Sequence, residues 1–344
     1  GCIVNLSEIR DIARKRLEGT CRVCRVCDGQ PCRGEVPGFG GVGTGSSFVN
    51  NVAALAAVRL DLRVLHDAGD PDTSLRLFGV DLKYPLLGAP VAGVKVNRMG
   101  GIGERDLAEA MICGPALAGV IGTGGDGADP EVFNIASEMI SRRAGGRGGM
   151  IIIKPREQRV ILEKIRQAEQ SGADAVGVDV DAAAFVNMTI LGQKVEPKTP
   201  DMIAELADST RLPFVVKGIM TVDEAETAAR AGAAAVVVSN HGGRVLDHTP
   251  GTAEVLPAIA RAVKGKVAVL ADGGVRSGND VLKMLALGAD AVLVGRPLAV
   301  AAVGGGVEGV KSWIEQAGLQ LRQAMIMTGC RRLSEVDDGI LWKG

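Results

Sequence analysis

A histidine and an arginine lie three positions apart in the stretch SNHGGRVLD (239–247). These residues, His241 and Arg244, follow the apolar run 233–238, which predicts a buried strand, so both would leave the C-terminal end of one strand. An imidazole can accept a proton near neutral pH, and a guanidinium can bind a carboxylate through two parallel hydrogen bonds. The spacing therefore predicts an enzyme in which a base and an anion anchor meet one small substrate.

The elements that would position this pair form a regular series from residue 86 onward. Eight short apolar runs alternate with amphipathic stretches, and they cover residues 86–92, 116–121, 150–153, 173–180, 213–217, 233–238, 267–271 and 289–294. Helical spacing of apolar residues marks 157–170 and 221–231, and a last helix is expected over 307–327. This series predicts an α/β fold, a (β/α)8 TIM barrel, and the alternative is a doubly wound open sheet of unusual width.

In such a barrel the active site lies where the strands end, so the residues after each run are informative. Lys217 ends the fifth run, and the turns after the seventh and eighth runs contain Asp272, Gly273, Gly274, Arg276, Gly295 and Arg296. Glycines let backbone N–H groups approach phosphate oxygens, and arginines add charge-assisted hydrogen bonds. The two turns predict a phosphorylated ligand or cofactor; the alternative is that the glycines only form tight turns and the arginines face solvent.

The first 85 residues do not follow the strand–helix series. They contain a helix-like start (6–17), a cysteine cluster, a glycine-rich stretch (38–45) and a charged segment (51–72). Their apolar content is too thin for a separate core. We therefore expect an N-terminal cap segment over residues 1–85, a ligand-binding barrel over 86–330 and a C-terminal tail over 331–344.

Composition excludes several classes of protein. The 39 basic and 40 acidic side chains nearly cancel, which argues against a nucleic-acid surface. The most apolar tract, 289–303, is interrupted by Arg296 and is shorter than the roughly 20 residues that a membrane helix needs. Seven cysteines, an odd number gathered mostly near one end, favour a reducing cytoplasm over a disulfide framework, and no secretory signal is apparent.

Four motifs occur in order along the barrel: VVKGI (215–219), SNHGGR (239–244), ADGGVRSG (271–278) and GRPLA (295–299). Together they resemble the FMN-dependent α-hydroxy acid oxidase and dehydrogenase family, which includes glycolate oxidase, lactate oxidase and flavocytochrome b2. The similarity extends from about residue 50, through RVLHD (63–67) and YPLLGAPVAG (84–93), to about residue 330. The resemblance implies an FMN cofactor, oxidation of a small 2-hydroxy acid and, often, a homotetramer.

The resemblance also implies roles for particular residues. His241 would take a proton from the substrate, either from the α-carbon or from the hydroxyl as hydride leaves, and Arg244 would bind the carboxylate. Lys217 would lie near flavin N1, where a positive charge favours the reduced flavin, and Asp181 would orient the histidine. For Asp181 the alternative is a helix cap. Backbone and hydroxyl contacts to the flavin are implied for Pro90, Ala92 and Thr123.

The chain departs from the family near the substrate. The family's tyrosine on the third strand would fall at about Ile153, and its second arginine, after the strand-four aspartate, at about Ala184. We hypothesise that Lys154 supplies the missing charge; the alternative is a lysine that contacts only flavin or solvent. Asp179 stands where the family commonly has threonine and adds a negative charge. The expected lid segment, 181–198, is short, which implies a more open or differently covered site.

A second departure is the cysteine quartet Cys21, Cys24, Cys27 and Cys32. The first three spacings match a ferredoxin-type run, but the fourth is one residue longer and the following proline is missing. Four thiolates this close could ligate an iron–sulfur cluster or a zinc ion, or the thiols could carry no metal. A cluster near the flavin would favour an electron-acceptor protein over direct reaction with oxygen.

The leading prediction is an FMN-dependent enzyme that oxidises a lactate-like 2-hydroxy acid to the 2-oxo acid. One alternative is an FMN enzyme of the same superfamily with other chemistry, similar to type 2 isopentenyl diphosphate isomerase. The other is a non-catalytic FMN-binding or redox-sensing protein whose output is the cysteine quartet.

Overall fold

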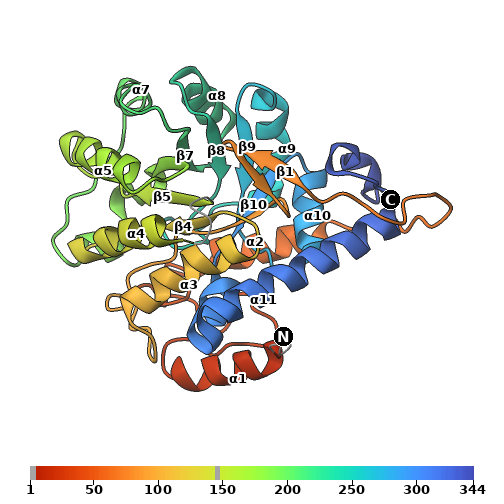
Figure 1. The fold of residues 1–344 in the computed structure, drawn as a ribbon, viewed down its shortest axis with the longest axis horizontal. Coiled ribbons are helices and arrows are strands. Elements are labelled where there is room, and N and C mark those ends of the chain that lie inside the picture. Colours follow the sequence, from red (N-terminus) through yellow and green to blue (C-terminus); the bar gives the residue numbers. More distant parts are fainter. Residues whose placement is uncertain (1–4, 144–147) are drawn as a thin grey trace.

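Eight parallel strands form the centre of the molecule in a computed structural model that describes residues 5–143 and 148–344 (Figure 1). The strands are β3 (Leu86–Gly88), β4 (Gly122–Gly124), β5 (Gly149–Ile153), β6 (Ala175–Asp179), β7 (Phe214–Ile219), β8 (Ala235–Val238), β9 (Ala268–Ala271) and β10 (Ala291–Val294). They pair in the order β3-β10-β9-β8-β7-β6-β5-β4. A bridge between Leu87 and Ile121 joins the two ends, so the sheet closes into a (β/α)8 barrel, as the alternation of runs predicts.

Helices follow the strands and form the outer layer of the barrel (Figure 1). They are α3 (Glu104–Leu117), α4 (Pro130–Arg142), α5 (Gln158–Gln170), α7 (Pro200–Asp208), α8 (Val222–Arg230), α9 (Thr252–Val263), α10 (Gly278–Ala286) and α11 (Arg296–Thr328). Local sequence sets several starts: Thr199 caps α7 by accepting the Met202 N–H, and Ser277 caps α10 by accepting the Asp280 N–H. The helix α11 changes direction at Gly306, whose φ of 58° is not helical.

Side chains along each strand alternate between two cores. One set, for example Met150, Ile152 and Val215, fills the barrel interior, and the other, for example Ile151 and Ile153, packs under the helices. Because every second side chain of a strand points inward, the next inward-pointing residue after the strand lies at the mouth of the barrel. Lys154 and Lys217 continue the interior rows, so the sequence delivers their charges to the C-terminal face.

The N-terminal segment contributes to both ends of the barrel. Helix α1 (Leu6–Arg16) packs against α11 (Figure 1). Arg16 donates to the Val303 carbonyl over 2.7 Å. The hairpin β1 (Leu75–Leu77) and β2 (Val80–Leu82) places its buried leucines in the interior cluster of the barrel. Helix α2 (Ser46–Ala57) lies beside α9. None of the helices in the described ranges is long and apolar enough to cross a membrane.

The structure corrects several boundaries that the sequence suggests. The run 116–121 does not form the second strand, because Ala116 and Leu117 end α3 and the strand begins at Gly122. The charged segment 51–72 begins inside α2, a helix that the pattern does not predict. The short lid segment folds into a 3-10 turn (Val180–Ala184) and the one-turn helix α6 (Val186–Thr189). Two further 3-10 turns, Leu333–Glu335 and Asp338–Ile340, lie in the C-terminal tail.

Candidate active site

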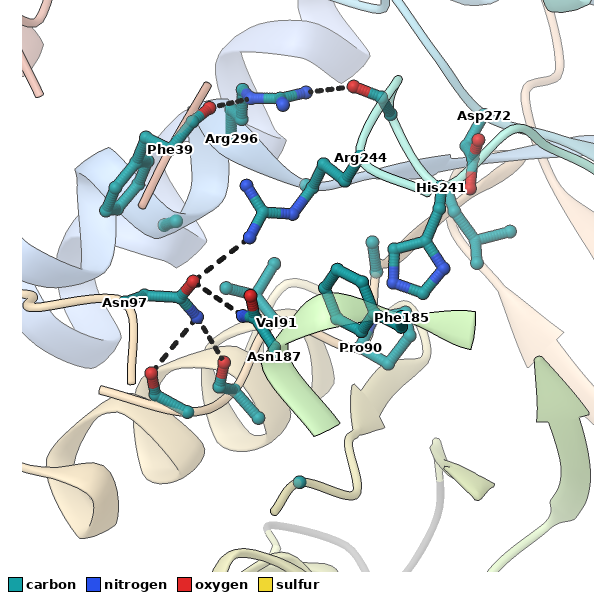
Figure 2. A pocket seen from close by; sticks show the side chains of 18 of the residues that line it. Phe39, Pro90, Val91, Asn97, Phe185, Asn187, His241, Arg244, Asp272 and Arg296 are labelled. Carbon is teal, nitrogen blue, oxygen red and sulfur yellow. Dashed lines mark hydrogen bonds between the residues drawn. The ribbon is translucent and has the colours of Figure 1, made fainter. Parts of the chain in front are cut away.

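A pocket enclosing about 1130 Å³, part of it open to solvent, lies at the C-terminal face of the barrel. Loops that follow β3, β5, β8, β9 and β10 line it, together with the glycine-rich N-terminal stretch and the lid segment (Figure 2). Most of the residues predicted for the site reach it: Pro90, Ala92, Lys154, Lys217, His241, Arg244, Asp272, Gly273, Gly274, Arg276, Gly295 and Arg296 line the pocket.

His241 sits in the loop after β8 with a carboxylate on its ring. Its Nδ1 is 2.9 Å from Asp181 Oδ1 and 3.8 Å from Asp179 Oδ2. An ionised carboxylate only accepts, so this contact assigns the proton to Nδ1 and leaves Nε2 free to act as a base. The backbone of His241 is left-handed, with φ of 58°, a strained conformation of the kind found at functional sites.

A glycine in β7 makes room for the Asp181 carboxylate. Gly218 has φ of 102°, and a Cβ there would lie 2.4 Å from Asp181 Cγ. The pairing of β7 with β8 shifts register between Lys217 and Ile219, on either side of this glycine. The motif VVKGI thus positions its lysine and also lets the aspartate approach the histidine.

Burial and nearby cations set the protonation of the pair. Burial lowers the pKa of His241 well below 6.5, and the charges of Lys217 and Lys154 lower it further, against the opposing effect of Asp179. Burial raises the pKa of Asp181, while the same two lysines oppose the rise. His241 is therefore neutral at neutral pH, the form in which it can accept a proton.

Two buried lysines pair with carboxylates at the mouth of the barrel. Lys154 Nζ is 2.5 Å from Asp179 Oδ2, and both side chains are at least nine-tenths buried. Lys217 Nζ is 3.7 Å from Asp272 Oδ2. Burial lowers the pKa of Lys217, but Asp272, Asp181 and Asp179 raise it by more, so its net pKa is raised and the side chain stays cationic. The extra charge of Asp179 is thus balanced by Lys154, which explains why this strand end tolerates an aspartate.

Arg244 crosses the pocket with its guanidinium held from one side. Its Nη1 donates to the Gly38 carbonyl over 2.6 Å and to the Gly40 carbonyl over 3.2 Å. Its Nη2 donates to Asn97 Oδ1 over 3.0 Å (Figure 2). Burial and the charge of Arg296 lower its pKa to about 9, so it remains a cation at neutral pH. These bonds fix the plane of the guanidinium, which is the condition for directional binding of a carboxylate.

Sequence reasoning missed the amide groups that hold Arg244. Asn97 Oδ1 also accepts from the Gly38 N–H. It accepts from Asn187 Nδ2 as well, while Asn97 Nδ2 donates to the carbonyls of Ala92 and Gly93 (Figure 2). One side chain therefore ties four chain segments together. No local pattern marks it, since an asparagine in a loop is ordinarily a turn residue.

Two aromatic side chains that the sequence did not single out shape the pocket. Phe185, from the lid segment, stacks obliquely on His241 with ring centroids 4.9 Å apart. Phe39 lines the pocket from the N-terminal stretch. The lid is short, as expected, but the N-terminal stretch shares in covering the site, because Gly38 and Gly40 bond to Arg244.

Neither Ile153 nor Ala184, the positions expected for the family's tyrosine and second arginine, lines the pocket. Ile153 is fully buried in the outer cluster under the helices, whereas its neighbour Lys154 faces the pocket. Ala184 is exposed, and the next residue, Phe185, is the one that enters the site. The alternation of side chains along a strand is the physical reason that Ile153 and Lys154 face opposite ways.

Arg276 and Arg296 lie at the end of the pocket formed by β9 and β10. Arg296 donates to the carbonyls of Phe39, Gly242 and Gly40 at 2.7 to 3.0 Å, and its guanidinium stacks 3.7 Å from the Phe48 ring centroid. Arg276 Nε donates to the Cys27 carbonyl over 3.1 Å. Both arginines are thus held by the N-terminal segment, which the sequence did not predict, rather than pointing freely into solvent.

The residues present fit a flavin nucleotide. Within the described ranges the Thr123 hydroxyl is buried without a hydrogen-bond partner, and so is Asp272 Oδ1. Thr123 does not line the pocket itself, but it shares the inward row of Ile121 below the mouth of the barrel. Buried polar atoms without partners are rare in native proteins, and a bound ligand is one way to supply the partner. The turn at Gly273 and Gly274, with φ of 95° and 85°, brings backbone N–H groups to the arginine end.

Several known proteins are similar to this chain in sequence and in fold. A family model described as FMN-dependent dehydrogenase matches residues 39–194 and 184–343. A 4-hydroxymandelate oxidase of Amycolatopsis orientalis is 34% identical over 86% of this chain and 90% of its own length. An L-lactate oxidase of Lactobacillus jensenii is 32% identical over 83% of this chain and 76% of its own, and the human 2-hydroxyacid oxidase 1 is 30% identical over 86% and 88%.

Solved structures agree with the sequence matches. A mandelate oxidase crystallised with benzoyl-formic acid superposes with a TM-score of 0.76 at 32% identity, covering 97% of this chain and 96% of the other. A mandelate oxidase variant with an FMN monooxide adduct has a TM-score of 0.72 at 34% identity, covering 90% and 98%. The motif order, the barrel and these similarities lead to one conclusion: the chain is an enzyme of the FMN-dependent dehydrogenase family.

Proposed function

We propose that this protein oxidises a small 2-hydroxy acid to the corresponding 2-oxo acid with FMN as its cofactor. The observation that carries the proposal is the neutral His241, held by Asp181, in one pocket with the fixed guanidinium of Arg244. Relatives named lactate, mandelate and 2-hydroxyacid oxidases support this substrate class. When bound, FMN accepts the two electrons of the oxidation.

Residues of the chain bind the substrate, take up its proton and stabilise the charge that develops. Arg244 binds the substrate carboxylate and so directs the hydroxyl-bearing carbon toward His241. His241 Nε2 takes the proton, and Asp181 stabilises the imidazolium that forms. Lys217, cationic at the strand end, stabilises negative charge that develops on the cofactor. Arg276, Arg296 and the turns at Gly273, Gly274 and Gly295 would hold its phosphate, with Pro90, Ala92 and Thr123 along the ring system.

The substrate end of the pocket favours a small aliphatic acid. Phe185 and Met188 from the lid and Phe39 from the N-terminal stretch fill this side with apolar surface. Lys154 adds a cation that is already paired with Asp179. We therefore propose a lactate-like acid whose carboxylate is bound by Arg244, with Lys154 tuning the charge around His241.

The pH dependence of turnover tests the part assigned to Lys154. Replacing Lys154 by methionine removes a cation that lowers the pKa of His241 and leaves Asp179, which raises it, without its partner. Since the base must be neutral, we expect the acidic limb of the kcat/KM profile to move to higher pH in this variant. The exposed Lys194→Met is the matched control and should leave the profile in place. If Lys154→Ala leaves the pH profile, the turnover and the flavin content unchanged, Lys154 has no role in catalysis or in flavin binding.

Anaerobic mixing of the purified flavoprotein with a panel of 2-hydroxy acids tests the function itself. Loss of flavin absorbance with small aliphatic acids is the expected result. If no acid of the panel bleaches the flavin, the protein is instead a non-catalytic FMN protein or a same-superfamily enzyme with other chemistry. Bleaching by mandelate but not by lactate would overturn the proposed substrate size.

Two acceptors can return the flavin to its oxidised form. The names of the relatives favour dioxygen, while the cysteine quartet favours an electron-carrier protein. Measuring oxygen uptake and the reduction of a one-electron dye side by side distinguishes the two acceptors.

We further propose a flavin-binding barrel over 86–330 that is covered by the segment 1–85, with 331–344 as a tail. By family resemblance we propose a homotetramer. We also propose a cytoplasmic location, which the odd number of cysteines supports.

A further inference from the structure

We propose that Cys21, Cys24, Cys27 and Cys32 form the ligand set of an iron–sulfur cluster bound beside the phosphate end of the flavin pocket. All four come from the loop between α1 and α2, and the structure shows each as a free, partly buried thiol. Each thiol lies close enough to others of the set for their charges to interact. The proposal goes beyond the oxidation of a 2-hydroxy acid, which needs no such centre.

The first half of the loop is held in a strained turn. Val23, between the first two cysteines, is buried and has φ of 46°, which is costly for a β-branched residue. Its N–H donates to Cys21 Sγ over 3.4 Å. Helix α1 fixes the turn, since Arg10 donates to the Cys24 carbonyl over 2.6 Å and Arg14 to the Val23 carbonyl over 3.2 Å. Strain of this kind persists where the surroundings impose it, often at functional sites.

The second half of the loop is anchored to the barrel. Arg276 donates to the Cys27 carbonyl over 3.1 Å and places Nη2 3.6 Å from Cys27 Sγ. The Cys32 carbonyl accepts the N–H groups of Gly41 and Glu35 at 3.3 and 3.4 Å. The four cysteines span only twelve residues of chain, and the loop that carries them is held by helix α1, by Arg276 after β9 and by hydrogen bonds within the loop itself.

Two cations face the quartet. Arg276 Nη2 lies 3.6 Å from Cys27 Sγ, and Arg296 lies close enough for its charge to act on Cys21 and Cys32. An iron–sulfur core held by four thiolates carries net negative charge, which the two guanidinium groups would offset.

The arrangement of the thiols favours a cluster over a single zinc ion. Thiolates that share one tetrahedral zinc ion lie about 3.8 Å apart, as Zn–S bonds of about 2.3 Å require. Among the described residues, the groups of three or more candidate ligands that converge within 4.8 Å comprise only Asp179, Asp181 and His241. No three of the four thiols come that close. In an iron–sulfur cluster the thiolates bind different irons, so a wider arrangement suits it, and the ferredoxin-type spacing of the first three cysteines agrees.

Metal and sulfide analysis of the full chain tests the proposal. The protein is produced with added iron, purified without oxygen, and assayed for iron, acid-labile sulfide and zinc per chain. We expect about four irons and four sulfides, and a paramagnetic resonance signal after reduction with dithionite. Cys24→Ser should remove most of the iron and sulfide, whereas Cys113→Ser, a partly buried free cysteine on α3, should keep both.

Other outcomes would overturn it. One zinc per chain without sulfide would assign the quartet to a mononuclear site, despite the spacing. If the protein holds no metal after reconstitution with iron and sulfide, the four cysteines are thiols that bind no metal. If Cys24→Ser does not fold, the metal and sulfide content of the unmodified protein still decides. None of these measurements depends on bleaching by hydroxy acids, so the two proposals fail separately.

Discussion

Replacing His241 by asparagine is expected to slow flavin reduction by a 2-hydroxy acid about 10²- to 10⁴-fold, the contribution of a well-placed general base. Asparagine suits the test because it tolerates the left-handed backbone that His241 adopts. FMN should remain bound, since the groups assigned to its phosphate lie on other loops. The measurement is anaerobic stopped-flow absorbance of the flavin against substrate concentration.

A second histidine of the chain provides the control. His248 has φ of 63° and is largely exposed, so His248→Asn repeats the same change in a similar backbone conformation away from the pocket. It should reduce its flavin at the unaltered rate. If His241→Asn holds FMN and still bleaches as fast as His248→Asn, the base is another group and the mechanism proposed for this pocket is wrong.

Replacing Arg244 by lysine should raise the KM for the hydroxy acid roughly ten- to a hundredfold. Lysine keeps the charge but cannot form two parallel bonds to a carboxylate, and the loss of that pairing is worth about 1.5–3 kcal/mol. Lysine also cannot replace the bonds to Gly38, Gly40 and Asn97 that fix the guanidinium plane. Steady-state kinetics with a small 2-hydroxy acid give the KM.

The methyl ester of the same acid shows whether the effect is specific. An ester lacks the anionic carboxylate, so the preference for acid over ester should shrink in Arg244→Lys. A variant that loses activity equally toward both compounds would indicate general damage to the pocket. An unchanged KM for the acid would place the carboxylate elsewhere in the pocket, where Lys154 is another lining cation.

Much of this architecture follows from local patterns in the chain. Apolar runs separated by amphipathic stretches require buried parallel strands with outer helices, and seven of the eight runs overlap a barrel strand. The strand β4 escaped prediction because two of its three residues, Gly122 and Gly124, are glycines, which have low strand propensity. The apolar residues before it belong to α3 and the connecting turn. This segment is a strand because it pairs with β5 in the tertiary structure, which its local sequence does not reveal.

The sequence by itself determined which chemical groups gather at the mouth of the barrel. Alternation along β5 and β7 sends Lys154 and Lys217 inward, and the motif after β8 carries His241 and Arg244 to the same face. Only the tertiary structure decided how these groups are tuned. Asp181 reaches His241 across 60 positions of sequence, Asn97 bonds to Arg244 across 147, and Gly38 bonds to it across 206. Such partners are set by closure of the barrel and by the path of the N-terminal segment over it, and neither leaves a local periodic signal in the chain.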